Sequence, residues 1–316
     1  MKFTILVITY NAKWEKLKLT LASILKQSVK DYEIVIADDG SNVFPESEIK
    51  SYLQEQNFTN YKLVINKQNQ GTVKNLISGL EVSEGEYVKF ISAGDLLFHE
   101  DTLQLIYDFM KNNQCECCFG LIQGYRFVEG KLEKLGFYHP FDMDAYRRDD
   151  KDKITKNLVL YSDNACGAAI TYENTFAKEY MNRIQNQVKY EEDIFQVLAA
   201  VENRHMRLLD EYVIWYEIGE GVTTQKKSGF EALIREDVDR FYRSLYEQYS
   251  DNRYVKKRYQ LLKLYKITNM YIRTFFRFFV NPDALLYFID TAKQKKRGVH
   301  SKETQLVGFL DRGDFQ

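Results

Sequence analysis

Four short polar segments in the first hundred residues carry side chains that could bind a charged ligand, and each follows an apolar run. The segments are Thr9-Tyr10-Asn11, Asp38-Asp39-Gly40-Ser41, Asn69-Gln70-Gly71-Thr72-Val73-Lys74-Asn75 and Gly94-Asp95. Carboxylates accept hydrogen bonds from N–H and hydroxyl groups, and glycine permits tight turns. A carboxylate such as Asp95 can also hold a divalent cation. Each segment alone is readily explained as a turn, but the ordered set predicts one shared binding site.

The apolar runs before these segments predict the strands that position them. Strands are expected at 3–9, 32–37, 62–65 and 87–91, with amphipathic helices at 13–26, 45–56 and 69–82. Strands that alternate with helices predict an α/β fold with a mostly parallel, doubly wound sheet. In such sheets the carboxyl ends of the strands meet at the edge where ligands bind. The polar segments are therefore predicted to meet there.

The pattern becomes less regular after residue 99. We expect a helix at 101–112, an antiparallel hairpin from 115–127 and 131–136, and a charged, irregular, mobile loop over the site at 139–156. A strand at 165–171, a short helix at 191–201 and a strand at 206–217 follow.

The last ninety residues have a long helical pattern. Helices are expected at 230–249 and 253–280, Pro282 interrupts the pattern, 284–293 resumes it, and the tail from residue 298 is expected to be poorly ordered. Residues 253–280 mix basic and aromatic side chains. This stripe predicts packing on the rest of the chain or on a second subunit, as in a homodimer. Contact with a membrane in the plane of the lipid surface is the alternative.

Composition excludes several classes of protein. The chain has 316 residues, 45% of them hydrophobic, and a net charge of −1, so its overall charge does not favour nucleic acid as a partner. Four cysteines do not form a disulfide framework, and Cys115, Cys117 and Cys118 are expected to be buried thiols rather than metal ligands. Neither a signal-peptide pattern nor an apolar run long enough to span a membrane is present. A cytoplasmic protein is therefore expected.

The polar segments, read with the strands before them, resemble the motifs of family 2 glycosyltransferases with the GT-A fold. The matching stretches are Ile8-Thr9-Tyr10-Asn11, Val35-Ile36-Ala37-Asp38-Asp39-Gly40-Ser41, Asn69-Gln70-Gly71-Thr72 and Phe90-Ile91-Ser92-Ala93-Gly94-Asp95. The resemblance covers residues 1–100 well, reaches about residue 224 loosely and leaves out the helical C-terminus. It implies a nucleotide-sugar-binding half (1–100), an acceptor-binding and catalytic half of the same domain (101–224) and a helical extension (225–316).

The resemblance also implies roles for the residues at the strand ends. Thr9, Tyr10, Asn11, Asp38 and Asp39 would line the nucleoside pocket, with Asp39 at the uracil edge of a UDP-sugar. Gly71 and Lys74 would lie near the diphosphate. Asp95 would bind Mn²⁺ or Mg²⁺. The sequence departs from the family pattern at Ser92 and Gly94, where aspartate is frequent, and this departure puts strict metal dependence in doubt.

Later segments resemble the catalytic part of the same family. Glu191-Glu192-Asp193 resembles the motif that supplies the catalytic base, with Asp193 as base and Glu192 as orienter or substitute. Cys166, Gly167 and Ala168 would form the wall on the acceptor side. The segment 219–224 resembles a part that closes over the donor. His205 is expected to be solvated or to cap a helix rather than to bind metal.

The expected function is that of an inverting glycosyltransferase. It would move a sugar from a nucleotide-sugar to a hydroxyl of a glycan or lipid-linked acceptor in bacterial surface-polysaccharide synthesis. The expected place of the enzyme is the cytoplasm, docked on the inner face of the membrane. An NAD-dependent oxidoreductase is disfavoured, because Thr9-Tyr10-Asn11 stands where a Gly-x-Gly-x-x-Gly turn is needed. A catalytically silent sugar- or membrane-binding module is the remaining alternative. Ser92 and Gly94 motivate it, whereas Asp95 and Asp193 oppose it.

Overall fold

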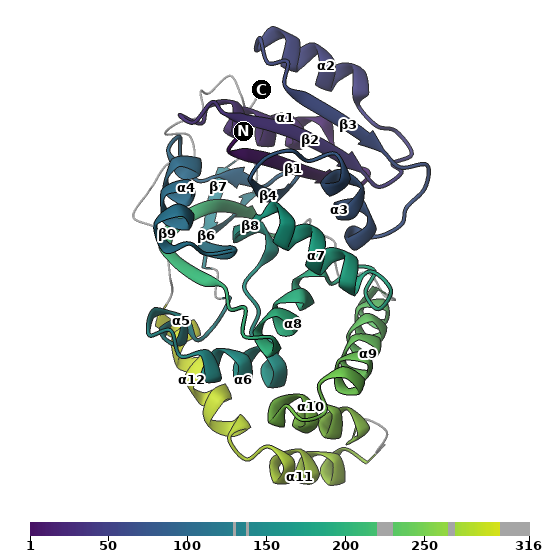
Figure 1. The fold of residues 1–316 in the computed structure, drawn as a ribbon, viewed down its shortest axis with the longest axis vertical. Coiled ribbons are helices and arrows are strands. Elements are labelled where there is room, and N and C mark those ends of the chain that lie inside the picture. Colours follow the sequence, from purple (N-terminus) through teal and green to yellow (C-terminus); the bar gives the residue numbers. More distant parts are fainter. Residues whose placement is uncertain (129–130, 137–138, 220–229, 265–268, 298–316) are drawn as a thin grey trace.

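The computed structural model describes residues 1–128, 131–136, 139–219, 230–264 and 269–297. Figure 1 shows a sheet flanked by helices, with a row of helices at the end of the molecule opposite β1–β3. The predicted segment at 220–224 and the predicted tail from 298 lie outside the described residues. In the part of the chain that is described, no helix is both long and apolar enough to cross a membrane.

The first half contains the predicted alternation of strands and helices. Its elements are β1 (Phe3–Thr9), α1 (Trp14–Leu25), β2 (Tyr32–Asp38), α2 (Glu46–Glu55), β3 (Tyr61–Ile65), α3 (Thr72–Glu81) and β4 (Tyr87–Ser92). The predicted elements of this half are confirmed, with small shifts at their ends. β1 pairs in parallel with β2 and β4, and β2 pairs in parallel with β3.

The second half extends the same sheet. Its remaining elements before the C-terminal helices are β5 (Leu96–Leu97), α4 (Thr102–Asn113), β6 (Cys117–Val128), β7 (Lys131–Leu135), β8 (Ile170–Glu173), α7 (Asn174–Ile184), α8 (Phe195–Val201) and β9 (Arg207–Glu217). The strand order is β3-β2-β1-β4-β8-β6-β9-β5, with β7 paired to β6. β8 runs antiparallel to β4 and β6, whereas β6 and β9 are parallel.

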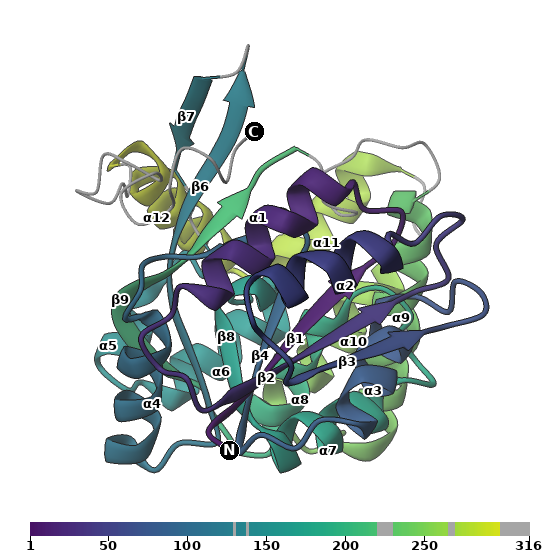
Figure 2. The same cartoon turned by 90° about the horizontal axis from the view of Figure 1, so that it is seen from above.

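Alternate residues of β1 pack into two separate cores. Phe3, Ile5 and Val7 point to the side covered by α1, α2 and α4, while Leu6 points to the side covered by α3, α7 and α8. Successive side chains of a strand face opposite sides of a sheet, so a strand that is apolar throughout needs helices on both faces. Figure 2 shows helices on either side of β1 and β2. The predicted fold class is confirmed in this arrangement.

The prediction of an irregular, mobile loop over the site at 139–156 is wrong, because most of this stretch is helical. It forms α5 (Met143–Arg147) and α6 (Lys151–Tyr161). The side chains of Asp142 and Asp150 accept hydrogen bonds from the backbone N–H groups of Ala145 and Lys153. These are ordinary N-caps, and the charged composition of the stretch hid them. α6 packs against α8 and α10 rather than forming a cover over the cavity described below.

Two other details differ from the expectation. The strand predicted at 165–171 begins only at Ile170, after a short 3₁₀ turn at Gly167–Ala169. Helix α7 had no predicted counterpart, although its apolar residues lie on one buried face. The short helix predicted at 191–201 is confirmed as a 3₁₀ turn at Glu192–Ile194 that leads into α8.

The C-terminal region consists of α9 (Phe230–Gln248), α10 (Arg253–Leu264), α11 (Met270–Val280) and α12 (Ala284–Arg297). The single helix predicted at 253–280 is therefore divided into α10 and α11. α12 is held to α6 by stacked Tyr161 and Tyr287 rings, 3.9 Å apart, and by a 2.9 Å ion pair between Lys156 and Asp283. α11 lies at the end of the molecule far from β1–β3 (Figure 1).

Candidate active site

A cavity of about 620 Å³ lies at the carboxyl edge of the sheet. This volume is within the usual range for small-ligand sites. The residues that line it come from α1, α3, the ends of β1, β2, β4 and β9, and the segments around 190 and 230. They are Ile8, Thr9, Tyr10, Asn11, Ala12, Lys13, Lys16, Asp39, Asn69, Thr72, Asn75, Ser92, Ala93, Asp95, Tyr190, Tyr216, Glu217 and Phe230. The structure thus brings the predicted Thr9, Tyr10, Asn11, Asp39 and Asp95 to one cavity.

Asp38 lies behind this cavity rather than in its lining. The side chain is fully buried. Its oxygens accept hydrogen bonds from Thr9 Oγ1 at 2.9 Å, from the Ser41 N–H at 2.7 Å and from Ser41 Oγ at 2.5 Å. These donors lie at the end of β1 and on the loop that follows β2. Asp38 therefore fixes these two segments to each other and gives the cavity its shape.

Asp39 connects the loop after β2 to the start of α3. Its Oδ1 accepts from the Gln70 N–H at 2.7 Å and its Oδ2 from the Gly71 N–H at 2.9 Å. Burial raises the pKa of Asp39, and the two backbone donors oppose that rise by stabilising the charged form. Asp39 remains part of the cavity wall, so the same carboxylate shapes the wall and faces the cavity.

Gly71 makes a close contact with Lys189 and does not line the cavity. Its φ is +91°, and a Cβ atom added to it would lie 2.6 Å from the backbone oxygen of Lys189. That oxygen also accepts a hydrogen bond from the Val73 N–H at 3.2 Å. The N–H groups of Gln70, Gly71 and Val73 thus already have protein acceptors. Lys74, the predicted diphosphate contact, lines a neighbouring hollow of about 330 Å³ that shares Asn69 with the main cavity.

Asp95 faces the cavity from the loop after β4 and is 4% exposed. Its loop is held to α1 by Thr20, whose Oγ1 accepts from the Gly94 N–H and donates to the Asp95 carbonyl oxygen, each at 2.9 Å. Asp95 Oδ1 accepts from the Glu217 N–H at 3.0 Å. Burial raises the pKa of Asp95 to about 7, although that N–H lowers it. A buried carboxylate with a perturbed pKa on the wall of a cavity is a candidate functional group.

Asp193 lies outside the residues that line the cavity, on the 3₁₀ turn before α8. Its Oδ2 accepts from the Gly167 N–H at 3.0 Å. Its Oδ1 is buried and has no hydrogen-bond partner among the described residues. Burial, and next the charge of Glu191, raise the pKa of Asp193 to about 8. Most buried polar atoms of folded proteins have a hydrogen-bond partner, so this oxygen is a candidate functional group.

The other 3₁₀ turn, Gly167–Ala169, donates to Asp193 from the Gly167 N–H and is also hydrogen-bonded to the central sheet. Lys89, which is fully buried on β4, donates from Nζ to the carbonyl oxygens of Ala168 and Ile170. Burial lowers the pKa of Lys89 to about 8. Cys166, Gly167 and Ala168 are therefore positioned between β4 and Asp193, outside the cavity lining. Glu192 is also outside it, and burial raises the pKa of Glu192 well above its usual range.

Sequence reasoning missed several residues of the cavity wall. Lys16, Tyr190, Glu217 and Phe230 all line it. The Tyr190 and Phe230 rings lie 5.1 Å apart in an edge-to-face contact. Asp237 of α9 holds this wall by accepting from the N–H groups of Lys189 and Tyr190 at 2.8 and 2.7 Å. Glu217 is the last residue of a predicted strand, but its place beside Asp95 depends on the pairing of β9 with β5.

Other polar groups lie elsewhere. His205 contacts Thr155 Oγ1 at 2.8 Å and is outside the cavity lining. Cys117 and Cys118 are buried free thiols, as predicted, and Cys115 is half-buried. Among the described residues, no group of three or more His, Cys, Asp or Glu side chains is placed to hold a metal.

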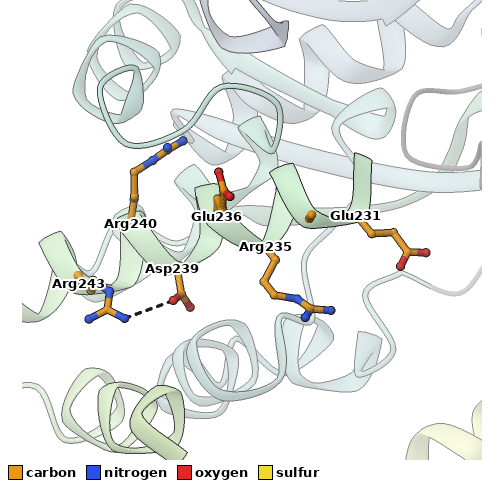
Figure 3. Close-up of a pocket in the computed structure, with 7 residues that line it drawn as sticks. Glu231, Arg235, Glu236, Asp239, Arg240 and Arg243 are labelled. Atoms are coloured by element: carbon orange, nitrogen blue, oxygen red, sulfur yellow. Dashed lines mark hydrogen bonds and ion pairs between the residues drawn. The ribbon is translucent and has the colours of Figure 1, made fainter. Parts of the chain in front are cut away.

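A second hollow, of about 660 Å³, runs along α9. Figure 3 shows its side chains along one helix, with Arg243 paired to Asp239. Its lining includes three arginines and three acidic residues, which balance in charge: Glu231, Arg235, Glu236, Asp239, Arg240 and Arg243. It contains none of the predicted site residues.

The comparison with known families identifies the class of protein. The sequence profile of glycosyl transferase family 2 matches residues 4–169, which is more than half of the chain. The chain therefore belongs to the family 2 glycosyltransferases, a family of transferases.

Named relatives are similar to this chain to different extents. It is 27% identical over 285 residues to the poly(ribitol-phosphate) beta-N-acetylglucosaminyltransferase TarP of Staphylococcus aureus (strain N315), over 84% of this chain and 78% of that protein. It is 26% identical over 217 residues to the glycosyltransferase GlyA of Streptococcus pneumoniae serotype 4 (strain ATCC BAA-334 / TIGR4). That match spans 68% of this chain but 29% of GlyA.

A solved structure has the same fold. The crystal structure of S. aureus TarS 1-349 in complex with UDP-GlcNAc matches with a TM-score of 0.52 and 20% identity. The match covers 76% of this chain and 66% of that chain, slightly less than two thirds. At this identity the likeness shows the fold alone, and it confirms the predicted GT-A architecture.

Proposed function

We propose that the protein is an inverting glycosyltransferase that uses a UDP-sugar and adds the sugar to a hydroxyl group of a cell-surface glycan. The observation that carries this proposal is the single cavity at the ends of β1, β2 and β4, lined by Asp39 and Asp95. UDP-GlcNAc is the first donor to test, because TarS was crystallised with it and TarP is named for N-acetylglucosamine transfer.

The residues of the cavity suit the parts of such a donor. Tyr190, Tyr216 and Phe230 offer aromatic surfaces for a base or sugar ring, and Asp39 offers a carboxylate for N–H or hydroxyl groups. Family 2 enzymes generally use a divalent cation, and the buried carboxylate of Asp95 would hold it. When bound, the cation would neutralise charge that develops on the leaving diphosphate.

We assign the role of catalytic base to Asp193. In inverting transfer, the acceptor hydroxyl oxygen forms a bond to the anomeric carbon as the bond from that carbon to the diphosphate oxygen breaks. The hydroxyl proton passes to Asp193 and the nucleoside diphosphate leaves. Asp193 Oδ1 is available to receive the proton, because it lacks another hydrogen-bond partner among the described residues. Since it is buried outside the cavity lining, the turn at Gly167 has to move to admit the acceptor hydroxyl. Gly167 and Lys89 would be positioning residues, since they hold the turn that contacts this carboxylate.

The acceptor is proposed as a class. Because TarP acts on poly(ribitol-phosphate) by its name, polyol-phosphate chains and lipid-linked glycans are the acceptors to screen first.

We also propose that the chain is divided into a donor-binding part (1–100), an acceptor-binding and catalytic part (101–224) and a helical extension (225–316). The first two parts supply strands to one sheet, so they are halves of one unit in this scheme.

The decisive experiment is transfer and hydrolysis of UDP-, GDP- and dTDP-sugars by the purified chain, with and without Mn²⁺. Turnover of a UDP-sugar that is lost in Asp193→Asn, with UDP binding retained, supports the proposal. Turnover of none of these donors would instead favour the catalytically silent module. Binding of UDP without turnover, measured by calorimetry, would show which half of the proposal fails.

We further propose that α11 and α12 contact an anionic membrane surface rather than a second copy of the chain. Tyr271, Phe275 and Phe279 lie on one face of α11 and are 80%, 68% and 77% exposed. Residues 253–297 contain twelve lysines and arginines but two aspartates and no glutamate. Two copies would bring like charges together, whereas anionic lipids complement them.

Vesicle binding tests the membrane contact. The chain should co-sediment with vesicles that contain phosphatidylglycerol and not with phosphatidylcholine vesicles, and Tyr271→Ser/Phe275→Ser/Phe279→Ser should abolish this binding. A chain that ignores both vesicles but forms a dimer that the triple substitution dissociates would overturn the membrane proposal in favour of self-association.

A further inference from the structure

The end of β9 places a second carboxylate, that of Glu217, beside Asp95. β5 pairs with β9 through Leu96–Trp215 and Leu97–Ile214, so the residue after Trp215-Tyr216 reaches the loop that precedes β5. The Glu217 N–H donates to Asp95 Oδ1 at 3.0 Å, and both side chains line the same cavity. Figure 2 shows the end of β9 beside α1. Two acidic residues that are 122 positions apart in the chain therefore meet at one wall.

Gly94 makes room for this carboxylate. A Cβ atom added to Gly94 would lie 2.3 Å from Glu217 Oε2, and the φ of Gly94 is +103°. A side chain at position 94 and the Glu217 carboxylate cannot occupy the same space. β4 ends at Ser92 and the loop after it carries Gly94, whereas aspartate is frequent at both positions in the family pattern. Glu217, which comes from another strand, thus places a carboxylate in the space beside Gly94.

We propose that Glu217 and Asp95 together hold the divalent cation of the donor complex. Mg²⁺-type sites are commonly built from one or two carboxylates, with the phosphate oxygens of the substrate and water completing the shell. A pair of carboxylates at the wall of a nucleotide-sugar cavity fits this donor set. The inference rests on the proposed function, because the diphosphate of the donor supplies the remaining ligands.

Lys16 supplies the alternative explanation for Glu217. Its Nζ lies 2.7 Å from Glu217 Oε1, so Glu217 could serve only as the partner of a lysine. The two explanations predict different behaviour. If Glu217 is a metal ligand, Lys16 competes with the cation, and its removal leaves metal binding intact or strengthens it. If the ion pair merely shapes the wall, removing either partner has the same effect.

The experiment measures how strongly Mn²⁺ promotes the binding of UDP to the full chain. UDP affinity is determined by calorimetry in Mn²⁺ and in EDTA, and the ratio of the two dissociation constants gives the coupling between the ligands. The variants are Glu217→Gln, Lys16→Met and, as a matched control on the exposed side of β9, Glu211→Gln. Melting temperatures confirm that each variant is folded.

In the wild-type chain Mn²⁺ should tighten UDP binding. Glu217→Gln should reduce this coupling by about tenfold or more, as loss of a metal-site residue usually does. Glu211→Gln should leave the coupling unchanged, and Lys16→Met should leave it unchanged or increase it. Equal losses in Glu217→Gln and Lys16→Met, or full coupling in Glu217→Gln, would overturn the inference.

Two results separate this inference from the proposed function. A wild-type chain that binds UDP equally well with and without Mn²⁺ would overturn the Glu217–Asp95 site and leave the transferase proposal standing. A chain that binds no UDP in either condition would overturn both.

Discussion

The strand-end cavity and the α11–α12 surface differ in how their side chains are held. At the cavity, the acidic side chains are held by groups from distant parts of the chain: Asp39 by the N–H groups of Gln70 and Gly71, and Asp95 by the N–H group of Glu217. On α11, by contrast, Tyr271, Phe275 and Phe279 are largely exposed. The first region is shaped before a ligand arrives, and the second would gain its contacts only from a partner. A substitution should therefore change chemistry or stability in the first region and association in the second.

The largest effect is expected for Asp193→Asn. Removal of a general base usually costs about 10²–10⁴ in rate, so transfer should fall by this factor. UDP affinity should stay the same, because Asp193 is outside the cavity lining. Steady-state kinetics and calorimetry measure the two quantities. Retained transfer would remove Asp193 as the base, and lost UDP binding would show that the two sites are not separate.

The pH dependence of transfer should report the raised pKa of Asp193, about 8. The base must be ionised, so the rate of the chemical step should rise about tenfold per pH unit below that value and level off above it. A flat single-turnover profile between pH 6 and 8 would contradict the assignment.

The same raised pKa has an opposite effect on stability. The folded state binds the Asp193 proton more tightly than the unfolded chain, so the stability of the wild type relative to Asp193→Asn should fall as pH rises from about 4 to 8. Melting temperatures of the two proteins across this range measure the difference. A difference that does not vary with pH would show that Asp193 is not perturbed in the folded chain.

Gly71→Ala should have a smaller effect that combines stability and binding. The positive φ and the nearby Lys189 backbone make an added Cβ costly, and such strain typically amounts to about 1–3 kcal/mol. Chemical denaturation measures this loss, and UDP affinity should fall with it because Asp39 is bonded to the same backbone. Gly219→Ala is a useful comparison, since its φ is also positive but the added Cβ meets nothing within 4 Å. Equal losses in both variants would mean that the backbone conformation alone, and not the contact with Lys189, is responsible.

The smallest effect on the isolated chain is expected on the α11 surface. The triple substitution Tyr271→Ser/Phe275→Ser/Phe279→Ser should change the free energy of unfolding by less than about 0.5 kcal/mol per site and leave UDP affinity unchanged. Denaturation and calorimetry test both points. A cooperative loss of stability would show that these rings pack inside the molecule, and the contrast between the two regions would disappear.

Sequence reasoning worked best where one local pattern determined one element. The apolar strands β1, β2 and β4 could be recognised because they are buried on both faces, and their polar ends followed. It failed at α5 and α6, where a single aspartate cap decides between loop and helix. It also missed Glu217, whose role depends on the pairing of β9 with β5. That pairing joins residues far apart in the chain, and the local sequence contains no sign of it.

Asp237 gives the C-terminal helices a part in the architecture of the catalytic unit. This α9 residue holds the backbone of Lys189 and Tyr190, and Tyr190 forms part of the cavity wall. A shortened protein that ends near residue 224, before α9, would therefore lose a support of its own cavity wall. Expression of a minimal catalytic fragment should keep α9, and a fragment without it would be a poor basis for judging whether the enzyme is active.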